Sequence, residues 1–262
     1  MAQANRSYSS KIIKAGALLA DTKTMLAHWD EALSISENLQ RFQCENIFGK
    51  ASRSRVDDIL AIFRQRYLTA ESVIKALTIL VKGRFPDQAL DRILYFHAAQ
   101  ADPLLHDLVA DVLWQFYSKG KTDIFVEDIQ ATIRHWVDTG QTTGRWSDYT
   151  TLRVAQGILS TLRDFGVLEG NVHKRLAPQY LPAEAFAYIA FCLRQDQPSG
   201  QRLIADPEWR LFFLSYQAVE RFFMEAHQRR LLEYYAAGSI VRITFPSASL
   251  AEYAHALLTR TP

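Results

Sequence analysis

Apolar residues recur every three or four positions through the first 117 residues, which is the spacing of helices that bury one face. The clearest stripe follows a predicted helix that opens at Ser54 and contains Val56, Ile59, Ile62, Phe63 and Tyr67. The same spacing predicts helices over residues 9–19, 24–33, 36–45, 69–81, 85–99 and 103–117, with Thr69 as an N-cap. We therefore expect an N-terminal bundle of roughly seven helices.

Residues 125–178 predict a different order, two helices followed by a short hairpin. The first helix spans residues 126–137, and Ser147 caps the second, which Gly166 ends. Short strands over residues 167–168 and 175–177 follow. The predicted buried side of the second helix holds Leu152, Ala155, Ile158, Leu159, Leu162 and Phe165.

The rest of the chain continues with helices and one alternating segment. Pro182 opens a helix to residue 193, Ser215 caps a helix to residue 234, and Ser249 caps a final helix. Residues 239–245 alternate in polarity, which favours a strand. The predicted fold is mainly α, with an N-terminal helical bundle (1–120), a winged-helix-like module (121–195) and a C-terminal helix–strand–helix segment packed on the rest (196–262). Short β-hairpins accompany the winged-helix-like part.

The order helix, turn, helix, strand, turn, strand is that of winged-helix modules, whose second helix enters the DNA major groove. Opposite the apolar side of that helix lie polar side chains: Tyr149, Arg153, Gln156 and Ser160. Arg153 and Gln156 are candidates to read base edges. The candidates for phosphate contacts are Arg145, Lys174 and Arg175, beside His173 at the hairpin turn. Such modules also dock proteins, and any surface helix has a polar face.

A second basic cluster contains Lys50, Arg53 and Arg55. Between residues 41 and 66, six Lys and Arg residues stand against three acids. The cluster precedes a predicted helix, and free amides at a helix N-terminus favour a phosphate. The N-terminal stretch adds further basic residues, which are Arg6, Lys11, Lys14 and Lys23. Most charge runs are solvated faces, so both interpretations stay open.

The net charge of the 262 residues is only +2, so a nucleic-acid function must rest on where the positive charges lie. The longest apolar run, residues 185–193, is about half the ~20 residues of a membrane span. The N-terminus has no secretory pattern, and Cys44 and Cys192 form no disulfide framework. We therefore expect a cytoplasmic protein that does not enter a membrane.

Signatures of catalysis are missing from the sequence. The seven histidines have no zinc-site spacing, and there is no nucleophile elbow or dinucleotide glycine motif. Gly49-Lys50-Ala51 lacks the other residues of a phosphate-binding P-loop. The expectation is a protein that is not an enzyme, with no cofactor, no metal site and no catalytic residues.

Residues 45–55 (Glu-Asn-Ile-Phe-Gly-Lys-Ala-Ser-Arg-Ser-Arg), with Arg66-Tyr67-Leu68, Gly16-Ala17-Leu18-Leu19 and residues 162–168, resemble the BrxA family of the bacteriophage-exclusion (BREX) phage-defence systems. The resemblance implies a largely helical protein that binds double-stranded DNA and has no known catalytic activity. It also implies partners, which are a DNA methyltransferase, an ATPase and an alkaline-phosphatase-like protein. The family fold is similar to that of the RNA-binding antitermination factor B.

Three hypotheses follow from the residues and the resemblance together. The first is a non-enzymatic, double-stranded-DNA-binding accessory component of a BREX system. The second is a protein–protein scaffold within that system, and the third is an RNA-binding regulator. The third rests on fold analogy alone.

Overall fold

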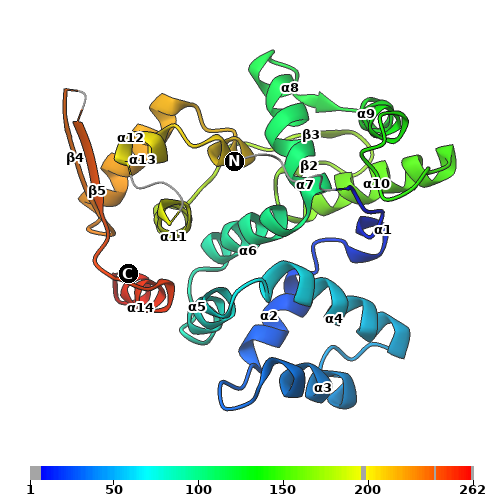
Figure 1. Cartoon of the computed structure of the whole chain (residues 1–262), viewed down its shortest axis with the longest axis horizontal. Helices are drawn as coiled ribbons and strands as arrows, with labels where there is room; N and C mark the ends of the chain where they lie inside the picture. Colours follow the sequence, from blue (N-terminus) through cyan, green and yellow to red (C-terminus); the bar gives the residue numbers. More distant parts are fainter. Residues whose placement is uncertain (1–6, 196–198, 239, 261–262) are drawn as a thin grey trace.

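The computed structural model describes residues 7–195, 199–238 and 240–260, and it is mainly helical with two small antiparallel sheets (Figure 1). The predicted mainly α fold class is confirmed. In Figure 1, α6 crosses the middle of the molecule, with α2 to α4 below it and α7 to α10 above it. The helices of the N-terminal bundle are α1 (Ile12–Ala15), α2 (Leu19–Ala27), α3 (Ile35–Glu45), α4 (Arg53–Tyr67), α5 (Glu71–Lys82), α6 (Asp87–Ala101), α7 (Pro103–Asp107) and α8 (Trp114–Ser118).

The helix predicted over residues 9–19 is interrupted, and the helix predicted over residues 24–33 is wrong beyond residue 27. Gly16 and Leu18 both adopt a φ of 54°, which a continuous right-handed helix excludes. The guanidinium of buried Arg66 donates a hydrogen bond of 2.9 Å to the Gly16 carbonyl. This contact from a distant helix supplies a partner for a backbone group that the interruption leaves outside a helix.

Two details of the later bundle also differ from the prediction. Thr69 is not the N-cap of α5, because Ala70 holds that position without a side-chain hydrogen bond. The helix predicted over residues 103–117 is helical throughout, but its middle is a π-helical segment, η1 (Leu108–Leu113). The Asp102 carboxylate caps its start, accepting from the backbone amide of Leu104 at 3.1 Å.

The middle segment has the predicted order of two helices and a hairpin, with one extra strand before them. The elements are β1 (Asp123–Ile124), α9 (Val126–Asp138), α10 (Asp148–Asp164), β2 (Leu168–Glu169) and β3 (Lys174–Leu176). The three strands form an antiparallel sheet in the order β1-β3-β2, with Asp123 and Glu169 both opposite Arg175. The sequence pattern missed β1, because two residues are too short for an alternation to be visible.

The C-terminal segment departs most from the prediction. The helix capped by Ser215 ends at Gln228 rather than at residue 234, and the residues after it enter a hairpin. Arg230 there adopts a φ of 59°, which a continuous helix does not allow. The elements are α11 (Ala183–Arg194), α12 (Gly200–Ile204), the 3-10 helix η2 (Pro207–Phe212), α13 (Tyr216–Gln228), β4 (Glu233–Ala237), β5 (Ile240–Thr244) and α14 (Leu250–Arg260). Ser239, the predicted start of β5, lies outside the described residues.

Buried side chains from all three segments form one continuous core. α14 returns to the N-terminal bundle and packs beside α5 (Figure 1). The contact is tight, because a Cβ atom added at Gly83 would lie only 2.3 Å from the Leu258 side chain. The last segment is therefore part of the folded body, and its other end carries the projecting β4–β5 hairpin.

α13 with its hairpin repeats the arrangement of α10 with its hairpin. Ser147 and Ser215 cap the two helices, each accepting from the backbone amide three residues later. An exposed arginine follows each cap by six residues, Arg153 in α10 and Arg221 in α13. The same three positions after the cap are buried in both helices, namely Thr151 and Val219, Ala155 and Phe223, and Ile158 and Ala226. The C-terminal segment thus contains a second helix–hairpin unit, which the sequence pattern did not reveal.

Candidate nucleic-acid interface

The exposed face of α10 holds the polar stripe that the sequence predicted. Tyr149 is 72% exposed, and Arg153 and Gln156 are exposed as well, whereas Ser160 is half-buried and accepts a hydrogen bond from Arg163. The opposite side is buried as predicted, although Leu152 is only half-buried and Val154 takes a core position instead. The stripe is therefore free to meet a ligand from solvent.

Both acids on α10 are paired with arginines of the protein. Arg134 on α9 contacts the Asp148 carboxylate at 2.9 Å, and Arg163 contacts that of Asp164 at 2.7 Å. These pairs compensate the two negative charges that would otherwise repel a polyanion from this helix. Sequence reasoning missed both arginines, because their partners are set by packing and side-chain geometry.

The β2–β3 turn is attached to α10. The Arg163 guanidinium donates to the Asn171 side-chain oxygen at 3.1 Å, and the Lys174 ammonium donates to the Asn171 carbonyl at 2.8 Å. Arg175 forms an ion pair with Glu169 on the neighbouring strand, so its charge is compensated. Val172 at the turn is 88% exposed. Of the two predicted phosphate contacts here, Lys174 keeps its charge without an ion pair among the described residues.

Helix α1 lies directly against α10 and extends its basic character. A Cβ atom added at Gly157 would lie 3.4 Å from the Ile13 Cα, so the backbones of the two helices approach closely. Lys11, the N-cap of α1, and Lys14 within it are exposed. Both lysines line the side of α1 that faces α4, while the α1 backbone packs against Gly157, one turn after Arg153 on α10.

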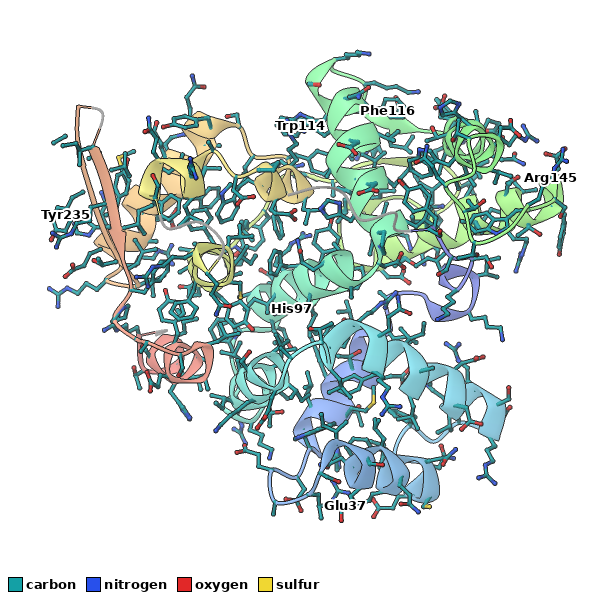
Figure 2. All side chains as sticks on the ribbon, viewed as in Figure 1. Glu37, His97, Trp114, Phe116, Arg145 and Tyr235 are labelled. Atoms are coloured by element: carbon teal, nitrogen blue, oxygen red, sulfur yellow. The ribbon has the colours of Figure 1, made fainter. Side chains whose placement is uncertain are left out.

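The start of α4 joins this edge through a hydrogen bond. The Arg55 guanidinium donates to the Lys14 carbonyl at 2.6 Å, and Arg53 beside it is exposed. Figure 1 shows α1 between α10 and α4, so segments far apart in sequence share one edge of the molecule. Figure 2 places Arg145 at the outer end of this edge, just before α10.

Lys50 does not join this basic edge. Its ammonium lies 3.0 Å from the Asp21 carboxylate on α2, and both side chains are partly buried. The sequence analysis grouped Lys50 with Arg53 because they are close in sequence, but in the fold their side chains face different surroundings. Arg6, another basic residue of the N-terminal stretch, lies outside the described residues.

A cleft of about 360 Å³ separates α1 from α4 within this edge. Lys11, Lys14 and Ser10 line it from the α1 side, and Asp58 and Gln65 line it from α4. Asp58 lies 3.6 Å from the Lys14 ammonium. Ile13, Ala61 and Ile62 supply the apolar rest of the lining, and Asp58 partly compensates the charge of Lys14.

No group of three potential metal ligands occurs in the ranges 7–195, 199–238 and 240–260. His97 is buried against the Tyr188 hydroxyl at 3.0 Å, and burial lowers its pKa to about 4. Across the same ranges, every helix is too short or too polar to cross a bilayer.

Comparisons with known proteins agree with the fold. A crystal structure of an uncharacterized protein from Magnetospirillum magneticum is similar at a TM-score of 0.62 and 14% sequence identity, covering 79% of this chain and 99% of that one. At this identity the similarity concerns the fold alone. No curated protein matches the sequence. The family profile of BrxA matches residues 6–192, well over half of the chain, and the chain therefore belongs to the BrxA family.

Proposed function

We propose that this protein is a non-enzymatic component of BREX phage defence that binds double-stranded DNA through the edge formed by α10, α1 and the start of α4. Membership of the BrxA family associates the chain with BREX systems. The observation that carries the DNA-binding proposal is the continuity of this edge. Basic and polar side chains from three separate segments adjoin there, and the α10 acids are paired.

The middle segment supports the proposal through its topology. Helices α9 and α10 with a β1-β3-β2 sheet have the order of a winged-helix module. In such a module α10 would be the recognition helix and the β2–β3 turn the wing. Arg153 and Gln156 would then face base edges, where an arginine pairs best with guanine and a glutamine with adenine.

The remaining basic residues would contact phosphates. Lys11, Lys14, Arg53 and Arg145 are exposed along the same edge, and Lys174 lies at the wing. Lys14 has an acid nearby as Lys50 does, but its ammonium lies farther from the carboxylate and its side chain is far more exposed. Contacts of this kind release counterions, so the affinity falls steeply as salt is added. With a net charge of only +2, binding depends on this local edge rather than on the whole surface.

Fluorescence anisotropy with a labelled duplex of about 30 base pairs, titrated between about 50 and 200 mM salt, tests the proposal. We expect binding that weakens with salt, and a loss of affinity of about tenfold in a variant that combines Arg153→Ala with Gln156→Ala. Lys75→Ala, which removes an exposed lysine on α5 far from α10, is the matched control. Absence of binding even at low salt would refute DNA binding, and stronger competition by duplex RNA would favour the RNA-binding regulator.

A protein scaffold is the second candidate, because the β4–β5 hairpin projects from the opposite edge of the molecule (Figures 1 and 2). Ile240 is 71% exposed and Tyr235 is 53% exposed on this hairpin, which pairs with no third strand in the described structure. Purified BREX methyltransferase, ATPase or phosphatase-like protein would be captured by the wild type and not by Ile240→Lys. If the wild type captures a partner, and Ile240→Lys does not but binds DNA as the wild type does, the scaffold is a separate role. Equal capture of the partner by the wild type and by Ile240→Lys would exclude the hairpin as the contact.

A further inference from the structure

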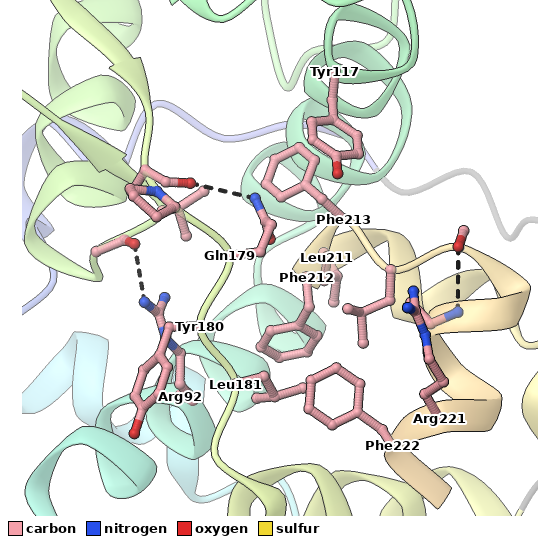
Figure 3. Close-up of a pocket in the computed structure, with 17 residues that line it drawn as sticks. Arg92, Tyr117, Gln179, Tyr180, Leu181, Leu211, Phe212, Phe213, Arg221 and Phe222 are labelled. Carbon is pink, nitrogen blue, oxygen red and sulfur yellow. Dashed lines mark hydrogen bonds between the residues drawn. The ribbon is translucent and has the colours of Figure 1, made fainter.

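A cavity of about 300 Å³ lies where the three segments of the chain meet (Figure 3). Arg92 on α6 and Tyr117 on α8 line it from the bundle, and the 177–181 connection lines it from the middle segment. Residues 211–215, with Ala218, Arg221 and Phe222 of α13, line it from the C-terminal segment. None of the predicted nucleic-acid contacts takes part. A ligand held here would be separate from DNA bound on the α10 edge.

The walls of the cavity are largely aromatic. Figure 3 shows the rings of Tyr117, Phe213, Phe212, Phe222 and Tyr180 around it, with Phe213 next to Tyr117 at a ring-centroid distance of 5.3 Å. Tyr180 is 54% exposed and Tyr117 is 40% exposed, so ring surface remains available to a ligand. Flat aromatic ligands stack on such surfaces.

Phe213 holds its place in the wall through an uncommon backbone conformation. Its φ is 54°, in the left-handed region that bulky residues rarely adopt. Hydrogen bonds from its amide to Arg210 (3.0 Å) and from the Leu214 amide to Trp209 (3.2 Å) maintain this turn after η2. Strain of this kind concentrates at binding sites.

The polar groups of the cavity favour an anion. Arg92 and Arg221 line it, and no Asp or Glu is among its described lining residues. Arg92 donates to the Phe165 and Gly166 carbonyls at 3.0 Å, which leaves further N–H groups of its five donors. Arg221 forms no ion pair with any described residue.

The start of α13 reinforces this preference. Ser215 lines the cavity and caps α13, and its hydroxyl accepts from the Ala218 amide at 3.3 Å. The positive end of the helix dipole therefore points to the same space as Arg221. On the opposite side, Gln179 supplies an amide that can bond the edge of a base.

We propose that this cavity binds a nucleoside monophosphate. The base would stack between the aromatic walls and bond Gln179, while Arg221 and the start of α13 would hold the phosphate, with Arg92 adding positive charge on the opposite side. The cavity volume lies at the lower end of the range of small-molecule sites, roughly 300–1,000 Å³, which suits a ligand of this size. Because all three segments contribute, the bound ligand would stabilise their arrangement.

Calorimetric titration and thermal unfolding with AMP, GMP, CMP and UMP test the proposal on the full chain. We expect at least one of them to bind saturably and to raise the unfolding temperature, since a ligand specific for the folded state stabilises it. Adenosine and inorganic phosphate, each carrying half of the ligand, should bind at least about tenfold more weakly than the best monophosphate.

Variants separate this site from the DNA edge. Arg221→Ala removes an exposed side chain and should weaken binding about tenfold, while Ala218→Leu should block it by filling the cavity. Arg153→Ala, at the matching position of α10, should weaken DNA binding and leave the nucleotide unaffected. No binding by any of the four at about millimolar concentration would overturn the proposal. Unchanged binding by both Arg221→Ala and Ala218→Leu would do the same.

Discussion

The imidazole of His106 contacts the carboxylate of Glu208, with its Nε2 atom 3.1 Å from both oxygens. The other ring nitrogen lies 2.7 Å from Asp107, whose second oxygen accepts from the Tyr8 hydroxyl at 2.7 Å. This chain of contacts connects Tyr8, α7 and η2, three parts of the chain that local sequence does not link.

The His106 contacts predict a stability that declines at alkaline pH. Burial opposes protonation, but hydrogen bonds with Asp107 and Glu208 outweigh it and raise the pKa of His106 from 6.5 to about 10. Because the folded pKa lies above the unfolded one, the stabilisation is complete below pH 6.5 and is lost as the pH rises through about 10.

Urea unfolding of the wild type and His106→Gln at about pH 6 and about pH 9.5 checks this. The variant should be less stable by about 1–3 kcal/mol at the lower pH, with a smaller difference at the higher pH. An identical difference at both values would show that the charge on His106 does not stabilise the fold.

Removal of the Arg66 guanidinium should destabilise the bundle. Arg66→Met leaves the Gly16 and Ala17 carbonyls without their buried donor, and we expect a loss of about 3 kcal/mol in the free energy of unfolding. Arg64→Met, at an exposed position of the same helix, is the control and should change stability by less than about 0.5 kcal/mol. Equal losses of stability for Arg66→Met and Arg64→Met in urea unfolding would show that Arg66 does not stabilise the interruption between α1 and α2.

The close approach of α1 and α10 is tested at Gly157. A leucine there has no room beside Ile13, so Gly157→Leu should displace α1, cost about 1–3 kcal/mol and weaken DNA binding. The salt dependence of DNA affinity should also become less steep, because Lys11 and Lys14 move from the edge. A destabilised variant with the wild-type salt slope would separate α1 from the proposed interface.

Lys50 and Arg53 should differ in their effect on DNA binding. Arg53→Ala removes an exposed charge at the start of α4, so the affinity should fall severalfold and the salt slope by about 1. Lys50→Ala should leave DNA affinity nearly unchanged, because its ammonium is paired with Asp21. If anisotropy shows a larger loss of DNA affinity for Lys50→Ala than for Arg53→Ala, the assignment of Arg53 rather than Lys50 to the DNA-binding edge is wrong.

The β2–β3 turn depends on Gly170. Its φ is 86°, and an added Cβ would lie 2.0 Å from the His173 carbonyl oxygen, so Gly170→Ala should destabilise the protein by about 2 kcal/mol. Gly120→Ala is a matched control, because Gly120 also has a positive φ but nothing within 4 Å of its added Cβ. Thermal unfolding should show a clearly larger loss for Gly170→Ala, and equal losses would mean that the contact with His173 is relaxed without cost.

Local sequence signals predicted α10 closely. The Ser147 cap, the apolar period and Gly166 each act within a few residues along the backbone, so the helix, its exposed stripe and the following hairpin could all be predicted. The same signals failed after Ser215, where α13 gives way to a hairpin. There, Arg230 adopts a left-handed φ of 59°, so the chain leaves the helix before Leu231 and Leu232 enter the core.

The sequence by itself determined the mainly helical class, the family and the polar side of α10, because these depend on periodicity and short motifs. Only the tertiary structure decided which charges share a surface. The Lys50 ammonium pairs with Asp21, whereas the guanidinium of Arg55, five residues later, donates to the Lys14 carbonyl. Helix α1 packs against α10. These contacts follow from packing between segments that are far apart in the sequence, and a local sequence pattern does not show which distant segments become neighbours.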